Sequence, residues 1–218
     1  MDEAGQTKFR LSQSESSRSR LLHIAVFTLI VSIYAGARLW HLTSACLWFD
    51  EIFSVHAARY GWVRMLNFVA ADVVHPPLFY GLLKIWIGIG GESLIWLRLL
   101  PALLSVVAIV PFVLLCRELR VRQAELYLAL LFMAVNGYLI KYAQEVRMYS
   151  LLLLLTLCSL WLFVKLLRSE AVSRRQLLIL FAINLLLVYT HYYGWMVVVV
   201  EGFYLYLRGN TSRRQFLI

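Results

Sequence analysis

Asp50 and Glu51 stand side by side in CLWFDEIFSVHAARYG, residues 46–61, just after the first long apolar run. Two adjacent carboxylates repel each other and are costly to desolvate, so they need water, a partner or a chemical task. One interpretation is a solvated turn, or a helix start at which Asp50 accepts backbone N–H groups. The other is a general base that takes a proton from a hydroxyl nucleophile, with Glu51 orienting it.

A second pair of candidate residues precedes two prolines in ADVVHPPLFY, residues 71–80. Pro76 restricts His75 to an extended backbone, and the next proline suits the first position of a helix. One interpretation is a rigid loop with an incidental histidine. The other places His75 near a phosphate or a metal, with Asp72 in support.

A third group occurs in KYAQEVRMY, residues 141–149, where Glu145, Arg147 and Tyr149 stand at the end of an apolar run. Arginine at the end of a membrane helix often only extends to the lipid head groups. Its fork of donors is also well suited to clamping a phosphate. A phosphate-bearing substrate at this depth would meet Arg147.

Two ionisable residues stand alone among apolar and aromatic neighbours. His191 lies in YTHYYGW, residues 189–195, where it is either an interfacial residue or part of a site. Glu201 lies inside the last apolar run and is expected to pair within a helix bundle.

The composition predicts a membrane protein. The chain has 218 residues, of which 61% are hydrophobic and 15% charged, whereas soluble domains are typically about 25% charged. The net charge of +9 comes mainly from short basic clusters between apolar runs. These are typical of topology signals, so we expect no nucleic-acid partner. The three cysteines have no C-x-x-C spacing and predict neither a disulfide framework nor a zinc site.

The apolar runs predict an all-α, polytopic bundle with six membrane spans. The spans cover residues 21–40, 94–116, 125–140, 149–167, 176–191 and 194–207. The last two come from one run that is too long for a single crossing of about 20 residues. The triplet at 35–37 resembles a signal-peptidase site, but the apolar run continues beyond it, which favours an uncleaved first span.

Four basic clusters orient these spans, and they lie at residues 8–20, 117–122, 165–175 and 208–214. The positive-inside rule places all four in the cytoplasm only if the apolar segment 77–91 does not cross. We therefore expect 77–91 to be an interfacial helix, anchored by Phe79, Tyr80 and Trp86, in an outer loop of residues 41–93. Residues 1–20 are predicted to be a disordered cytoplasmic tail, and residues 208–218 a cytoplasmic end.

With this topology the candidate residues fall on one membrane face, the outer one. They are Asp50, Glu51, Asp72 and His75 from the first outer loop, and Glu145, Arg147, Tyr149 and His191 from two later loops. Ionisable groups gathered at one face of a membrane bundle indicate a site. The sequence has no Walker-type loop, G-x-G-x-x-G or H-E-x-x-H motif, so we expect no nucleotide bound by a soluble fold.

On these residues, the chain resembles the C-type-fold membrane glycosyltransferases, specifically the protein O-mannosyltransferase-like family, which uses dolichyl- or polyprenyl-phosphate sugars. The resemblance covers nearly all of residues 21–207. It rests on WFDE, DVVHPPLFY, YAQEVRMYSL and YTHYYG in that order. Members of the family are typically about twice as long, so the chain is expected to be either an N-terminal portion, whose acceptor side would be incomplete, or a minimal version of the family.

The resemblance implies transfer of a sugar, with inversion, from a polyprenyl-phosphate donor to a hydroxyl of a protein, lipid or glycan on the outer face. The expected location is a bacterial inner membrane, with the N-terminus in the cytoplasm. A divalent metal is compatible with the carboxylates and histidines and is not required by them. The alternatives are a transporter or flippase for a phospho-sugar lipid, or an inactive fragment.

The resemblance also implies roles for the candidate residues. Asp50 matches the family's catalytic carboxylate, with Glu51 in support, and Arg147 matches an arginine at the lipid-phosphate leaving group. The residues expected to line the same cavity are His75, His191 and Tyr149, with Asp72 and Glu145 in support.

Overall fold

The computed structural model describes residues 3–72 and 75–208, with side chains from residue 20 onward. These residues form eleven α-helices and no β-strand, which confirms the all-α fold class. The first six helices are α1 (Glu3–Leu39), α2 (Phe49–Arg59), α3 (Trp62–Asp72), α4 (Leu78–Gly90), α5 (Leu94–Val107) and α6 (Ile109–Glu118). The other five are α7 (Gln123–Val135), α8 (Gly137–Ala143), α9 (Tyr149–Arg168), α10 (Arg174–Thr190) and α11 (Gly194–Leu207).

In the described part of the chain, three helical segments are long and apolar enough to cross a membrane. They are Arg20–Leu39 in α1, Leu94–Glu118 in α5 and α6, and Tyr149–Arg168 in α9. The bent pair α7 and α8 makes a fourth if it is one span. α10 and α11 have 17 and 14 residues, fewer than the ~20 of a straight crossing. The structure therefore supports a membrane protein with three or four candidate spans.

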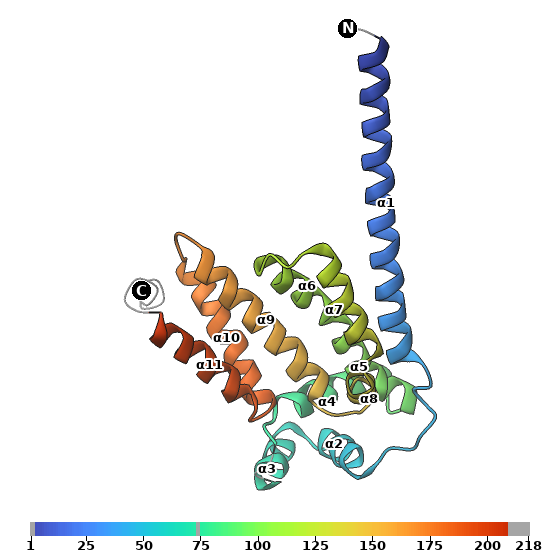
Figure 1. Ribbon diagram of the computed structural model, residues 1–218. Helices are drawn as coiled ribbons and strands as arrows, with labels where there is room; N and C mark the ends of the chain where they lie inside the picture. The colour runs from blue at the N-terminus through green and yellow to red at the C-terminus, as the bar shows by residue number, and fades with distance from the viewer. Residues whose placement is uncertain (1–2, 73–74, 209–218) are drawn as a thin grey trace.

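The loops divide between two ends of the bundle (Figure 1). The α6–α7 and α9–α10 loops lie within the basic clusters 117–122 and 165–175. Both loops lie at the end from which the N-terminal part of α1 extends. α2, α3, α8 and the α10–α11 turn lie at the opposite end. The fold thus separates these basic clusters from the candidate site residues. The side that each end takes in a membrane stays a prediction.

α1 is longer than the predicted first span. The helix begins at Glu3, whereas the sequence predicts a disordered tail over residues 1–20. The tail is rich in good helix formers, and extending an existing helix needs no new nucleus. Residues 1–2 of the predicted tail, and 209–218 of the predicted cytoplasmic end, lie outside the described residues.

The predicted span 125–140 is not one straight helix, because α7 and α8 meet at a bend of 59°. Asn136 begins α8, and its side-chain oxygen accepts a hydrogen bond from the Leu139 N–H at 3.0 Å. The buried Arg38 of α1 donates to the Met133 carbonyl at 2.9 Å. A cation thereby satisfies the free carbonyl end of α7 and stabilises the bend.

α4 coincides with the predicted interfacial helix 77–91, but its aromatic side chains do not anchor it as predicted. Phe79 and Tyr80 are each only 1% exposed, so both belong to the protein core. Trp86 stacks on Trp96 of α5, with ring centroids 4.3 Å apart, and each indole N–H donates to the other residue's carbonyl. Contacts with the protein therefore fix this helix.

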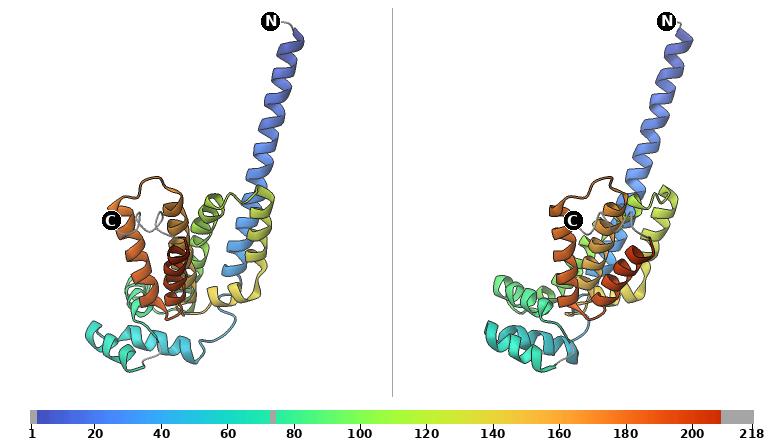
Figure 2. Two further views of the ribbon diagram at one scale, coloured as in Figure 1. Left: turned by 60° about the vertical axis from the view of Figure 1, so that its left-hand side comes forward. Right: turned by 90° about the vertical axis from the view of Figure 1, so that its left-hand side faces the viewer.

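α2 and α3 run across the end of the bundle instead of along it (Figure 2). A hydrophobic cluster joins α2 to α4, α5 and the start of α9, and includes Val55, Phe79, Leu97, Val146 and Met148. Val146 and Met148 flank Arg147 and are both buried. This packing fixes the loop before α9 and so determines where the guanidinium of Arg147 lies.

Candidate active site

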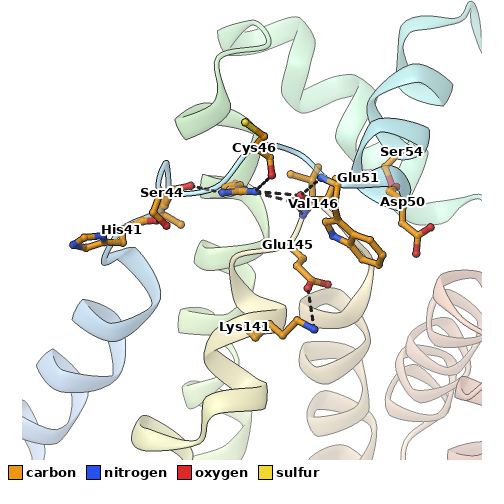
Figure 3. A network of polar contacts seen from close by, with 12 residues as sticks. His41, Ser44, Cys46, Asp50, Glu51, Ser54, Lys141, Glu145 and Val146 are labelled. Carbon is orange, nitrogen blue, oxygen red and sulfur yellow. Dashed lines mark hydrogen bonds and ion pairs between the residues drawn. The ribbon is translucent and has the colours of Figure 1, made fainter.

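The start of α2 separates the two adjacent carboxylates. Trp48 is the N-terminal cap, and its backbone N–H donates to Glu51 Oε2 at 3.1 Å. Successive side chains of a helix point about 100° apart. In Figure 3, Glu51 points toward Val146, while the Asp50 carboxylate points away from it. The two carboxylates therefore have different partners.

Glu51 is fully buried and paired with Arg98 of α5. Arg98 donates to Oε2 at 3.1 Å and to Oε1 at 3.4 Å, and the Val146 N–H donates to Oε1 at 2.9 Å. Arg98 also donates to the carbonyls of Leu42 and Cys46. The sequence predicts Glu51 as a catalytic group. In this geometry it links α2, α5 and the loop before α9, with its oxygens directed into the protein.

Asp50 faces Arg147. The Asp50 side chain is 37% exposed and that of Arg147 is 2% exposed, with Arg147 Nη2 3.8 Å from Asp50 Oδ2. Arg147 Nη1 donates to the Asp50 carbonyl at 3.3 Å and to Ser54 Oγ at 3.4 Å. A buried cation is thus fixed beside a carboxylate that a substrate can reach.

His75 holds the other amino group of Arg147, whose Nη2 lies 2.8 Å from His75 Nε2. A guanidinium can only donate, so Nε2 accepts, and the hydrogen of the ring is assigned to Nδ1. His75 Nδ1 donates to Asp72 Oδ2 at 2.9 Å. The sequence places His75 near a phosphate or a metal, among the residues expected to bind the substrate phosphate with Arg147, His191 and Tyr149. The structure makes it an acceptor that orients Arg147, with Asp72 orienting His75 in turn.

Arg147 Nε and the Tyr80 hydroxyl are buried and form no hydrogen bond of normal geometry among the described residues, although the Arg147 guanidinium lies close enough to Tyr80 to interact with its hydroxyl. Burial raises the pKa of Tyr80 to about 12, and the nearby Arg147 guanidinium opposes that rise. A buried donor without an acceptor costs about 1–3 kcal/mol. A group rich in acceptor oxygens, such as a phosphate, would relieve this cost.

His191 and Tyr149 lie next to this cluster. The His191 ring centroid is 6.4 Å from that of His75 and 6.3 Å from that of Tyr149. His191 Nδ1 accepts from the Tyr193 N–H at 3.1 Å, so a neutral ring carries its hydrogen on Nε2. Burial lowers the pKa of His191, and the neighbouring His75 and Arg147 lower it further. His191 is therefore a neutral donor at pH 7.

The turn that carries His191 depends on Gly194. A Cβ atom at Gly194 would lie 2.6 Å from the Leu187 carbonyl oxygen, which is closer than van der Waals contact allows. The His191 N–H donates to the same carbonyl at 3.2 Å, and the Gly194 N–H donates to the His191 carbonyl at 2.8 Å. α10 and α11 can approach this closely only without a side chain here.

Glu145 faces a different pocket from Asp50. This pocket has a volume of about 370 Å³, and its lining includes Trp48, Glu51, Lys141 and Glu145. Lys141 Nζ lies 3.7 Å from Glu145 Oε1, and Figure 3 draws this ion pair as a dashed line. Glu145 Oε2 has no partner among the described residues. Burial raises the pKa of Glu145, and the charge of Glu51 adds to the rise. The Arg147 N–H donates to the Glu145 backbone carbonyl at 2.7 Å, but among the described contacts the Glu145 carboxylate pairs with Lys141 and not with the Arg147 guanidinium.

Three adjoining pockets connect His75 with the surface of α10. The first, of about 540 Å³, is lined by residues that include His75, Pro77 and Tyr189. The second, of about 590 Å³, shares Leu66, Pro77 and Tyr189 with it and is almost entirely apolar. The third, of about 600 Å³, shares Tyr189 and Trp195 with the first. Together they form an apolar path that starts beside Arg147's partner His75.

The described residues contain no group of three or more His, Cys, Asp or Glu side chains that could hold a metal ion. The divalent metal considered from the sequence therefore has no ligand set in this part of the chain.

Three residues of the site were not predicted for it. Arg98 stands in the apolar run LIWLRLLP, and an ionisable residue inside a predicted span signals a buried partner. Ser54 follows Asp50 by one helical turn, a spacing that places both on one helix face. Nothing in the sequence distinguishes the hydroxyl of Tyr80 from that of an interfacial tyrosine.

Comparisons with protein-family models, curated proteins and solved structures found no match for this chain. The chemistry of the site therefore rests on its own geometry.

Proposed function

We propose that the protein is an integral-membrane glycosyltransferase of the protein O-mannosyltransferase-like family, which moves a sugar, with inversion, from a polyprenyl-phosphate donor to an acceptor hydroxyl. The supporting observation is the reachable Asp50 beside the buried Arg147, where Arg147 Nε and the Tyr80 hydroxyl form no hydrogen bond of normal geometry among the described residues. Displacement at a sugar phosphate needs two such groups, a base for the nucleophile and a cation for the leaving phosphate.

Arg147 binds the leaving phosphate. The bond between the anomeric carbon and the phosphate oxygen breaks with its electron pair going to the phosphate, so negative charge grows there. His75 and Ser54 fix Arg147 before the substrate binds, so its donors need little reorganisation. The Tyr80 hydroxyl and His191 Nε2–H are further donors at the same cluster. One such donor typically contributes about 10²–10³-fold to the rate.

Asp50 acts as the base. It takes the proton of the acceptor hydroxyl while the hydroxyl oxygen bonds to the anomeric carbon, on the face opposite the departing phosphate, which inverts that carbon. Glu51 supports this step indirectly, because its ion pair with Arg98 holds the start of α2.

The three adjoining apolar pockets receive the polyprenyl chain. They begin at His75, next to the phosphate-binding arginine, and continue along α10, whose Leu185 and Tyr189 are exposed. Van der Waals packing of the isoprene units in these pockets adds affinity. The headgroup and the tail of one donor lipid would thus be bound by neighbouring parts of the fold.

The site faces the outer side of the membrane in this proposal. The basic clusters then lie in the cytoplasm, as the positive-inside rule requires, and α10 and α11 serve as two short spans. The acceptor is a protein, lipid or glycan hydroxyl on that outer side, and the membrane is a bacterial inner membrane.

The proposal is tested by reconstituting the protein in native membrane lipids with a radiolabelled polyprenyl-phosphate sugar. Label is then followed in the protein, lipid and glycan fractions. Asp50→Asn should lower transfer by about 10²–10⁴-fold and leave donor binding intact. Glu125→Gln, an exposed carboxylate at the other end of the bundle, is the matched control and should keep full transfer.

Three outcomes contradict the proposal. Undiminished transfer by Asp50→Asn removes Asp50 as the base. Translocation of the donor lipid without transfer, equal in wild type and variant, favours the transporter. Absence of donor binding in both proteins excludes both functions.

A further inference from the structure

Glu201 is a titratable group that the proposed reaction does not use. It lies within α11 and is 4% exposed. Oε1 lies 2.6 Å from Ser159 Oγ of α9, and Oε2 lies 2.7 Å from Asn184 Nδ2 of α10. Ser159 Oγ lies 2.5 Å from Asn184 Oδ1. The three side chains form a closed ring of short contacts that joins α9, α10 and α11.

A count of hydrogen atoms determines the protonation state of this ring. Each of its contacts needs one hydrogen, and Ser159 supplies one. Asn184 supplies one, because in either orientation of its amide the nitrogen faces one neighbour and the oxygen faces the other. The remaining hydrogen can come only from Glu201. With an ionised carboxylate, two oxygen atoms would meet at hydrogen-bond distance with no hydrogen between them.

We therefore propose that Glu201 is a proton-binding site, a carboxylic acid that keeps its proton at neutral pH and uses it to close the ring with Ser159 and Asn184. In this state each of the three contacts in the ring has one hydrogen atom between a donor and an acceptor. A neutral ring also avoids placing an unpaired charge in the bundle, which is costly where water is excluded.

The charged groups around Glu201 are compatible with this state. Arg168 of α9 and Arg208 at the end of α11 line a pocket of about 300 Å³ with Glu201 and Tyr204, and α10 contributes no lining residue to it. Neither arginine forms an ion pair with Glu201, which has no ion-pair partner in the described part of the chain. An ionised Glu201 would lack a counter-charge in direct contact.

A neutral carboxylic acid in such a pocket is a modification site for a hydrophobic carbodiimide. The acid O–H adds across one C=N bond, so the carboxyl oxygen bonds to the central carbon and the proton goes to a nitrogen. The resulting O-acylisourea rearranges to a stable N-acylurea, and no other reactant is needed. The pocket lining of Leu160, Val164 and Val200 suits an apolar reagent. Because an ionised carboxylate carries no proton, labelling reports the protonation state.

The first test treats the full chain in mild detergent with dicyclohexylcarbodiimide at neutral pH and maps the adduct by peptide mass spectrometry. Glu201 should be labelled, and Glu51, which is also buried but is ion-paired with Arg98, should not. Labelling of Glu201 that appears only after acidification would mean that the group is ionised at neutral pH, and would overturn the proposal.

The second test does not depend on access of a reagent. Glu201→Gln supplies an amide N–H in place of the carboxyl hydrogen, so the ring stays closed and the variant should fold. Wild-type Glu201 releases its proton only on unfolding. Raising the pH above about 5 should therefore destabilise wild type relative to the variant, by up to tenfold in the unfolding equilibrium per pH unit. Parallel pH profiles for the two proteins would overturn the proposal.

Discussion

Asp50 and Glu51 are adjacent in the chain, yet only the Asp50 carboxylate faces Arg147. Glu51 is fully buried against Arg98, whereas the Asp50 side chain is 37% exposed and lies 3.8 Å from Arg147. Asp50 is thus partly exposed beside Arg147, and Glu51 faces the core. A substitution at Glu51 should therefore mainly lower stability, and one at Asp50 should mainly lower the proposed transfer activity.

Glu51→Gln should destabilise the protein by about 3–5 kcal/mol, because it leaves Arg98 buried without its counter-charge. Denaturant or thermal unfolding in detergent measures this loss. Asp50→Asn is the comparison variant and should cost less, about 1 kcal/mol, because the Asp50 carboxylate is 37% exposed and 3.8 Å from Arg147. Equal losses in the two variants would contradict the division of roles.

The helices and the two ends of the bundle could be predicted from the sequence because both depend on local composition. Apolar runs predict α5 with α6 and α9 closely, since a span needs a continuous stretch of apolar residues. Basic clusters predict which loops share an end. The gathering of Asp50, His75 and Arg147 follows from that topology, because their loops lie at the same end.

The pairing of side chains could not be predicted in this way. Arg98 meets Glu51, and Arg38 meets the end of α7, through contacts between residues far apart in sequence. The burial of Phe79 and Tyr80 depends on which face of α4 packs against α2, and its apolar composition is the same for a lipid-facing helix. Hydropathy indicates that a side chain is removed from water, but it does not indicate whether lipid or another part of the protein packs against that side chain.

His75 should act as a positioning residue for Arg147. His75→Ala removes the acceptor for a charged donor, and the affinity for a polyprenyl phosphate should fall by about tenfold or more. His75→Gln keeps an acceptor oxygen and should restore most of the affinity. Binding of radiolabelled polyprenyl phosphate checks both variants. If alanine and glutamine weaken binding equally, His75 does not act through its acceptor.

His191 should make stability depend on pH. Its pKa in the folded protein is lowered, mainly by burial, so the unfolded chain takes up a proton first as the pH falls. Stability should therefore be lost progressively below the ordinary histidine pKa of about 6.5. The thermal midpoints of wild type and His191→Gln are compared from pH 8 to pH 5 in steps of about one unit. The midpoint of wild type should fall more steeply with decreasing pH than that of the variant, so the two should diverge in the acidic range. His23→Gln, at an exposed position of α1, is the control, and divergence of the same size there would contradict the assignment.

Tyr80→Phe should weaken binding of the donor lipid without lowering the stability of the protein. The Tyr80 hydroxyl is buried and forms no hydrogen bond of normal geometry among the described residues, so removing it should leave the free energy of unfolding unchanged or raise it by about 1 kcal/mol. If that hydroxyl donates to the phosphate of the donor lipid, the same substitution should weaken polyprenyl-phosphate binding by about tenfold. A protein that is as stable as wild type and binds less well cannot be explained by damage to the fold.

Tyr204→Phe, at the other end of the bundle, is the matched control and should leave binding unchanged. A Tyr80→Phe variant that loses stability and keeps its affinity would show that the hydroxyl serves the fold and not the substrate.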